Sequence, residues 1–420
     1  MILNNKNKIL IYLICYLSLI LGFFLNEDFA FGFIRDHLVH KKVLNIFENN
    51  ILHGFLNYGK DPTSSEKTIP HSPIFIFYMH LLEKFTQNDF FSRLINLHFC
   101  LLIPFIFYKG LLIKYKSKTN SLYFLIPIIF FLSPYFRSGS IWIDDNIFSL
   151  IFFSISIYYF LKFQNEEKRL NFIFYNTLFF AIACYIRPIY CLFGIYFFLS
   201  YYYDLEKKKY LIYYICLNIL LSFPAVYYVF ILEINEWFQQ YLFRRNIISV
   251  ISLATSVIFF YLIPFILYFV KIKNIKKFSI LEYILFLGYF LILILFFEYS
   301  LPYSGGIFYK LSKLILNTHL LFYFLSAISL VLLTKFILVN QNKKNNLFDI
   351  ILIIILITIE LDGVIYHETY DPLMYILVFL VFKNEIVKKF ISEFNYNKFI
   401  LIFTFVSFFY FSSVIKTLIF

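Results

Sequence analysis

The sequence predicts an all-α protein, a polytopic transmembrane helical bundle with about 13 membrane-spanning helices. Hydrophobic residues make up 61% of the 420 residues and charged residues 15%, and the mean hydropathy is +0.76. This composition leaves too little polar surface to cover a water-soluble domain of this length. Apolar runs of roughly 17 to 24 residues recur between short charged segments, which is the length that crosses a hydrocarbon core. Backbone inside lipid must satisfy its own hydrogen bonds, so helices are expected.

The N-terminal segment is expected to be an uncleaved first helix. Lys6 and Lys8 precede an apolar run over residues 9–25. This run is long for a secretory signal, and no small-residue cleavage site follows it. The two lysines favour a cytoplasmic N-terminus, so the first helix delivers residue 26 and those after it to the other side of the membrane.

Residues 26–92 are predicted to form one large extracytoplasmic loop that carries juxtamembrane helices. Within it, residues 73–82 are apolar but span only about 10 residues, which is typical of an interfacial helix rather than of a crossing. The second crossing is then expected to begin near Arg93.

If residues 73–82 do not cross the membrane, the charges of the remaining loops all favour the same orientation of the chain. The inner loops carry about 20 Lys and Arg residues and the outer loops about 6, and such a bias sets orientation. Counting 73–82 as a crossing would reverse this excess. The chain is therefore predicted to be a multi-pass protein of the inner (plasma) membrane. The inner loops are 114–118, 162–169, 204–209, 271–277, 335–344 and 383–398, and the outer ones 136–145, 186–187, 233–247, 298–319 and 360–372.

The whole chain, 1–420, is predicted to be a single integral membrane domain, because no soluble domain, fixed-period repeat or Gly/Ser linker is evident. The net charge of +12 is spread over the short loops, which indicates membrane orientation rather than nucleic-acid binding. The five cysteines lie in or beside apolar runs without metal-ligand spacing, so we expect small core side chains and no disulfide.

Four clusters of polar residues lie on the predicted outer side, where ionisable groups near a bilayer are costly to keep. Carboxylates there can accept a proton from a hydroxyl or hold a divalent cation, and Arg, Lys and His suit a phosphate. The clusters are Arg35-Asp36-His37 with His40; residues 67–73 with Lys67 and His71, followed by Arg93; Arg137 with Trp142 and Asp144-Asp145-Asn146; and Tyr185-Ile186-Arg187-Pro188.

Each cluster also has a purely structural alternative. Asp36 fits a solvated position in a polar loop. Asp144 and Asp145 fit the start of the following helix, where Asp is a preferred cap. Arg187 fits a surface charge at a helix start, and His71 fits a structural histidine in a turn.

The order of these motifs resembles the GT-C class of membrane glycosyltransferases, and is similar in plan to protein O-mannosyltransferases and to bacterial transferases that move aminoarabinose onto lipid A. The resemblance covers about residues 1–205, a glycosyltransferase-like half, and leaves 206–420 as a variable transmembrane half. The segment 367–372, HETYDP, resembles a pattern near the end of some members. The other matching positions are Asp36; His71-Ser72-Pro73-Ile74, with Ser72 where the class has Pro, then Arg93-Leu94; Ser133-Pro134 with Asp144-Asp145; and Arg187-Pro188.

The resemblance implies an inverting hexosyl or pentosyl transfer from a polyprenyl-phosphate sugar to a lipid or glycan acceptor of the cell envelope, on the outer face of the cytoplasmic membrane. Partners would be the lipid-linked donor, the acceptor and membrane lipids, without nucleic acid. Asp36 would be the general base, and Asp144 or Asp145 would position the acceptor. A divalent cation is left open, with Asp36, Asp144 and Asp145 as its ligands if one binds. The residues implied to hold the donor phosphate are Arg93, Arg187, Lys67, His71 and Arg137.

Two alternatives remain. A transporter or lipid flippase would call for charged or broken helices near the midplane, or inverted repeats, and neither is evident in the sequence. An O-antigen polymerase or ligase generally carries its largest outer loop late in the chain, whereas here the large loop follows the first helix.

Overall fold

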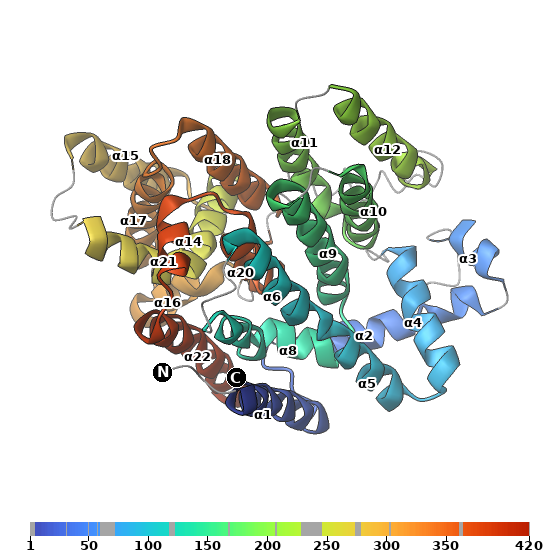
Figure 1. The fold of residues 1–420 in the computed structure, drawn as a ribbon. Helices are drawn as coiled ribbons and strands as arrows, with labels where there is room; N and C mark the ends of the chain where they lie inside the picture. Colours follow the sequence, from blue (N-terminus) through green and yellow to red (C-terminus); the bar gives the residue numbers. More distant parts are fainter. Residues whose placement is uncertain are drawn as a thin grey trace. The chain divides into compact units, whose positions relative to one another are not determined.

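The computed structural model describes residues 5–30, 32–48, 50–56, 58, 72–116, 122–166, 169–205, 208–227, 246–273, 279–301, 304–360 and 364–419. Every regular element in these ranges is a helix, and none is a strand (Figure 1). The predicted all-α class is therefore confirmed for the described part of the chain. Lys67 and His71 lie outside the described residues.

Six helices of the described chain are long and apolar enough to cross a membrane, and a seventh is added if the bent pair Tyr123–Phe131 and Pro134–Ile141, which meets at 63°, counts as one span. This agrees with an integral membrane protein. The number 13 and the sidedness of the loops stay predictions. The six segments are Lys6–Phe24, Asp89–Tyr115, Asp145–Asn165, Ile247–Lys271, Leu320–Ile337 and Tyr396–Thr417, and shorter apolar helices are Leu170–Ile186, Tyr210–Val226 and Ile280–Phe296.

The chain divides into two compact units. Unit 1 consists of Met1–Cys191, Phe198–Trp237 and Asn395–Phe420, so the described residues 208–227 and the last helix group with the predicted catalytic half rather than with the variable half. The helices that begin in unit 1 are α1 Asn5–Phe24, α2 Phe33–Lys41, η1 Leu44–Phe47, α3 Ile51–Leu56, α4 Pro73–Thr86, α5 Asp89–Cys100, α6 Leu102–Tyr115, η2 Tyr123–Leu125, α7 Ile128–Phe131, α8 Pro134–Ile141, α9 Asp145–Asn165, α10 Leu170–Ile186, η3 Pro188–Leu192, α12 Lys208–Val226 and α22 Tyr396–Ile419.

Unit 2 consists of Leu192–Phe197 and Phe238–Phe394. Its longest described helix is α14, which packs against α16, α17, α18 and α21. The hydroxyl of Tyr261 on α14 lies 3.1 Å from His367 Nδ1, so the 367–372 motif begins at a buried turn beside α14. The helices outside unit 1 are α11 Phe193–Asp204, which runs across the division, and α14 Ile247–Lys273, α15 Ile280–Phe296, α16 Gly306–Leu316, α17 Leu320–Ile337, α18 Lys343–Thr358, α19 His367–Tyr370, α20 Leu373–Ile376, η5 Leu377–Val381 and α21 Glu385–Ser392.

Helix α4 covers the segment that was predicted to be interfacial. It has 14 residues and is not among the helices of membrane length. Ser72 caps its first turn by accepting from the Ile74 backbone N–H at 3.2 Å, and Pro73 occupies the first helical position. Ser and Pro are preferred there because one satisfies an orphan N–H and the other has none to satisfy. Capping explains why Ser stands at position 72.

A buried side-chain amide links helices α9 and α10 within unit 1. Asn176 on α10 donates to the Ser156 carbonyl of α9 at 3.0 Å and to its hydroxyl at 2.8 Å. The Tyr201 hydroxyl donates to Asn176 Oδ1 at 3.0 Å. Side-chain hydrogen bonds between helices are a recurrent source of association in membrane proteins. This one holds α9, which begins at Asp145, against α10, which ends just before Arg187.

Candidate functional site

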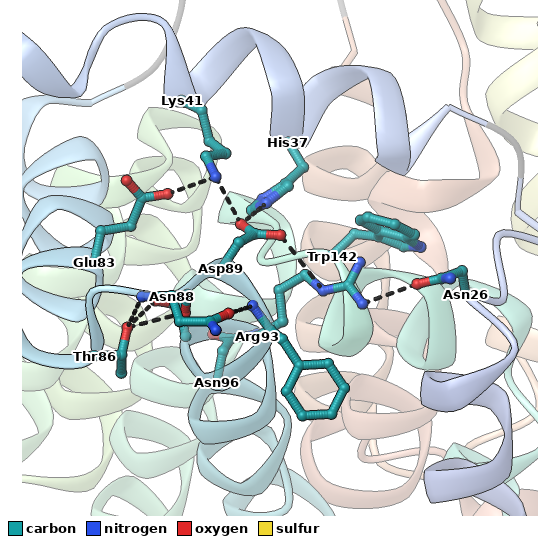
Figure 2. A network of polar contacts seen from close by, with 12 residues as sticks. Asn26, His37, Lys41, Glu83, Thr86, Asn88, Asp89, Arg93, Asn96 and Trp142 are labelled. Atoms are coloured by element: carbon teal, nitrogen blue, oxygen red, sulfur yellow. Dashed lines mark hydrogen bonds and ion pairs between the residues drawn. The ribbon is translucent and has the colours of Figure 1, made fainter.

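A network of polar side chains lies beyond the end of α1, where α2, the α4–α5 turn and the end of α8 meet (Figure 2). Helix α4 ends at Thr86, and its C-cap Gln87 has a left-handed φ of 52°. Asn88 then caps α5 by accepting from the Phe90 N–H at 2.9 Å. Asp89 therefore stands in the first turn of α5, where a carboxylate is favoured by the helix dipole.

Asp89 is the centre of this network. His37 Nε2 lies 2.9 Å and Lys41 Nζ 3.0 Å from Asp89 Oδ1, and Lys41 Nζ also lies 3.0 Å from Glu83 Oε1. Partial burial disfavours the Lys41 ammonium, but hydrogen bonds to Glu83 and Asp89 outweigh this effect and raise its pKa. Helix α2 is thus tied to the α4–α5 turn by one buried histidine and one half-buried lysine.

Arg93 lies one turn further along α5 and is 6% exposed. Its guanidinium is centred 3.9 Å from the Trp142 ring and donates from Nη2 to Asn26 Oδ1 at 2.9 Å. Its Nε is 3.9 Å from Asp89 Oδ2, which is ion-pair distance, but this buried nitrogen has no hydrogen-bond partner among the described residues. Arginine has five N–H donors, and the described chain fills one of them. Arg93 therefore keeps donors for an anionic ligand.

Arg137 presents the opposite case. It forms a bidentate pair with the buried Glu27, with Nε 2.6 Å from Oε1 and Nη2 2.5 Å from Oε2. Its remaining donors reach the Ser18 hydroxyl at 3.1 Å, the Ser18 carbonyl at 3.0 Å and the Phe131 carbonyl at 3.1 Å. All five N–H groups are filled. Arg137 holds α8 to the end of α1, and the phosphate contact predicted for it would have to displace one of these acceptors.

Gly22 on α1 makes room for this ion pair. A Cβ at position 22 would lie 2.8 Å from Arg137 Nη2 and fall on the Glu27 carboxylate. We expect Gly22→Ala to destabilise the protein by about 1–3 kcal/mol, the usual cost of overpacking a packed core. The measurement is the melting temperature of the purified protein in detergent. The control is Gly288→Ala on α15, where a Cβ meets nothing within 4 Å; equal melting shifts for the two variants would contradict the prediction.

Asp144 has the capping role that the sequence allowed as an alternative. Its Oδ1 accepts from the Asn146 N–H at 3.0 Å and the Ile147 N–H at 3.2 Å, at the start of α9. Asp144 and Asp145 are both buried. This geometry does not test the predicted contact of either carboxylate with an acceptor.

The Asp144-Asp145 cluster and the Arg187 cluster meet at Tyr190, a buried residue of η3. Its ring packs against Phe153 of α9, with the two ring centroids 4.5 Å apart, so η3 lies against the helix that Asp145 begins. Burial raises the pKa of the Tyr190 hydroxyl, the charge of Arg187 and a hydrogen bond to Ser149 lower it, and the carboxylates of Asp145 and Asp144 raise it. The fold thus brings together two clusters that are about 40 residues apart in the sequence.

Asp36 is exposed on α2, one position before the buried His37. The same helix approaches the start of α9, because a Cβ at Gly139 would lie 3.2 Å from Phe33 Cε1 and 3.3 Å from Asp144 Cβ. Helix α2 therefore lies near Asp144 as well as near the α4–α5 turn.

The sequence did not single out four acidic or basic residues that organise this site: Glu27, Lys41, Glu83 and Asp89. Their best signal was position, since each lies within a few residues of an apolar run or of a predicted cluster. Among the described residues no group of three or more His, Cys, Asp or Glu side chains is placed to hold a metal ion. The described residues therefore do not supply a ligand set for a divalent cation, and whether one binds stays open.

Comparison with known proteins gives no match among protein families, curated proteins or solved structures. The functional assignment therefore rests on this chain's own residues.

Proposed function

We propose that the chain is a glycosyltransferase that moves a sugar from a polyprenyl-phosphate carrier to a lipid or glycan acceptor on the outer face of the plasma membrane. The observation that supports this most is Arg93, a buried guanidinium on Trp142 with unfilled donors. A fixed arginine in a partly dehydrated site suits the phosphate of a leaving carrier, because the developing charge is stabilised without reorganising water. Arg137, with five filled donors, supplies the contrast within the same unit.

In the proposed reaction Asp36 takes a proton from the acceptor hydroxyl, whose oxygen attacks the anomeric carbon of the donor sugar. The bond between that carbon and the phosphate oxygen breaks with inversion, and the phosphate leaves on its polyprenyl carrier. Arg93 and Arg187 neutralise the charge that develops on the phosphate. Asp145 positions the acceptor, while Asp144 holds the start of α9.

The Asp89 network supports this reaction by fixing the position of the base. His37 and Asp36 are neighbours on α2, and the bonds of His37 and Lys41 to Asp89 hold that helix on α5, which carries Arg93. A base and a phosphate-binding group act together only if their separation is maintained. The network is therefore a positioning device rather than part of the proton transfer.

The proposal predicts a defined change in surface chemistry. Deleting the gene should remove one sugar from surface glycolipids or glycans, as measured by mass spectrometry, and the wild-type gene should restore it. Arg93→Gln should lower the restored product by about 10- to 100-fold, the equivalent of a charge-assisted hydrogen bond of roughly 1.5–3 kcal/mol. Arg93→Lys should also fall short, because an ammonium lacks the planar fork.

Arg35→Gln is the matched control, since Arg35 is an exposed arginine of α2. It should restore the product fully, at equal protein level. An unchanged glycan profile after deletion, or full restoration by Arg93→Gln, would overturn the proposal. Accumulation of a lipid-linked sugar on the cytoplasmic side would favour the flippase alternative instead.

A further inference from the structure

Helices α15 and α17 of unit 2 form an antiparallel pair, and α16 lies in the connection between them. Lys335 in the last turn of α17 pairs with Glu282 in the first turn of α15, with Nζ 2.7 Å from Oε2. At the other end, the rings of Phe297, just after α15, and Phe322, in the first turn of α17, have centroids 5.1 Å apart. The two helices have 17 and 18 apolar-rich residues, the length of a crossing. The segment between two such helices lies at a bilayer surface.

One face of α16 is fixed to the protein. The helix has 11 residues and is therefore about 16 Å long, which is too short to cross a membrane. Tyr309 and Ser312 are fully buried. The Ser312 hydroxyl donates to the Thr318 carbonyl at 2.7 Å and accepts from the Phe322 N–H at 3.0 Å. These bonds hold α16 across the start of α17.

The opposite face of α16 is apolar and exposed. Leu311, Leu314 and Ile315 are 38%, 74% and 59% exposed. At 3.6 residues per turn these three side chains lie on the side of the helix away from Tyr309. The exposed apolar surface continues at Leu320, the first residue of α17. A contiguous apolar surface of this kind marks a site of interaction with another protein or with a membrane, and its continuity with a membrane-length helix favours the membrane.

The charged residues of α16 are two lysines, Lys310 and Lys313, and the helix contains no Asp or Glu. Both lie between its buried and its exposed face. Lys313 Nζ is 4.9 Å from the centroid of the Tyr309 ring. A lysine in this position lays its aliphatic stem along apolar surface while its ammonium reaches the headgroups, and basic residues at a membrane surface are attracted to anionic lipids.

We infer that α16 is an interfacial helix that lies flat on the bilayer and binds the headgroups of anionic phospholipids through Lys310 and Lys313. Its exposed leucines and isoleucine enter the boundary between headgroups and acyl chains. The inference holds for either side of the membrane. It is independent of the sugar-transfer proposal.

Helix α21 is the contrast within the same unit. It is also short and amphipathic, and it carries two exposed lysines, Lys388 and Lys389. Its apolar residues, however, are all buried in the protein: Ile386, Val387, Phe390 and Ile391. Helix α21 therefore has no apolar face left for a lipid, whereas α16 has one.

The test places a fluorescent reporter on the exposed face. Leu314→Trp is made in the full-length protein, which is reconstituted into nanodiscs of phosphatidylcholine and phosphatidylglycerol. The emission of the protein's own Trp142 and Trp237 is subtracted with the wild type. We expect the added emission to be quenched by lipids brominated in the acyl chain and protected from acrylamide in the water. Ile315→Trp is a second reporter on the same face.

The same reporter measures which lipid surrounds α16. Brominated phosphatidylglycerol should be favoured over brominated phosphatidylcholine by about fivefold, the equivalent of roughly 1 kcal/mol for a lysine near an anionic surface. Adding Lys310→Gln and Lys313→Gln to the reporter variant should bring the two lipids close to equality. Adding Lys388→Gln and Lys389→Gln instead should leave the preference unchanged.

Three outcomes would overturn the inference. Quenching by acrylamide but not by brominated lipid would place the face in water. Quenching by neither would mean that protein, such as a second copy of the chain, covers it. Equal quenching by the two brominated lipids in the reporter variant would exclude recognition of anionic headgroups.

Discussion

Arg137→Gln is expected to lower the free energy of unfolding by about 3–5 kcal/mol, because it leaves the Glu27 carboxylate buried without its partner. Glu27 and Arg137 are both almost fully buried, and Gln lacks the charge and the bidentate fork. Glutamine also forfeits most of the bonds that Arg137 makes to Ser18 and Phe131. The protein is heated in detergent at a series of temperatures, and size-exclusion chromatography then measures the fraction that remains monodisperse at each temperature.

A double variant separates the lost charge partner from lost packing. Glu27→Leu combined with Arg137→Met should recover much of the stability, because replacing a whole buried ion pair by apolar side chains is often nearly neutral. Arg35→Gln, an exposed arginine, should melt like the wild type. If Arg137→Gln also melts like the wild type, Arg137 does not hold α8 to α1 in the way described.

The class of fold was predictable because it follows from one dominant energy term. Unpaired backbone in lipid is so costly that a long apolar run must be helical, and this requires no knowledge of tertiary contacts. The apolar run 73–82 is covered by α4, which is a helix of 14 residues; its predicted position at the membrane interface stays a prediction. The number of crossings is harder, because the apolar helices Leu170–Ile186 and Ile280–Phe296 are near the length at which a helix spans a bilayer.

The candidate site was only partly predictable, because charge near a membrane has two explanations that look alike in a sequence. Arg93 and Arg137 were selected for the same reason, that an arginine near lipid is costly. The structure separates them, since Arg137 meets that cost with Glu27, 110 residues away. No local pattern encodes such a partner. The same holds for His37 and Asp89, which are 52 residues apart.

The capping residues show the reverse case, in which a local rule was sufficient. Asp144 was allowed as a cap from sequence because an Asp before an apolar run satisfies the first backbone N–H groups of a helix. Its two backbone contacts agree with that rule. Asp36 is exposed and lies in the first turn of α2, where the helix dipole also favours a carboxylate. Its position agrees with a structural role as well as with a catalytic one, and only the activity of a variant separates the two.

Asp36→Asn is expected to lower sugar transfer by about 10²- to 10⁴-fold, the usual contribution of a general base. The amide keeps the size of the side chain but cannot take a proton from the acceptor hydroxyl. Because Asp36 is exposed, the melting temperature should stay within the error of the wild type. The measurement is the amount of restored surface product in the deletion strain, normalised to the amount of membrane-inserted protein.

Glu48→Gln is the matched control for this loss, because Glu48 is another exposed carboxylate of the same predicted outer loop, just after η1. It should restore the product fully. Equal losses in the two variants would mean that the loop needs negative charge in general rather than a base at position 36. Full activity of Asp36→Asn would remove Asp36 from the proposed reaction. A loss of activity accompanied by a lowered melting temperature would instead mean that Asp36 stabilises the fold of α2.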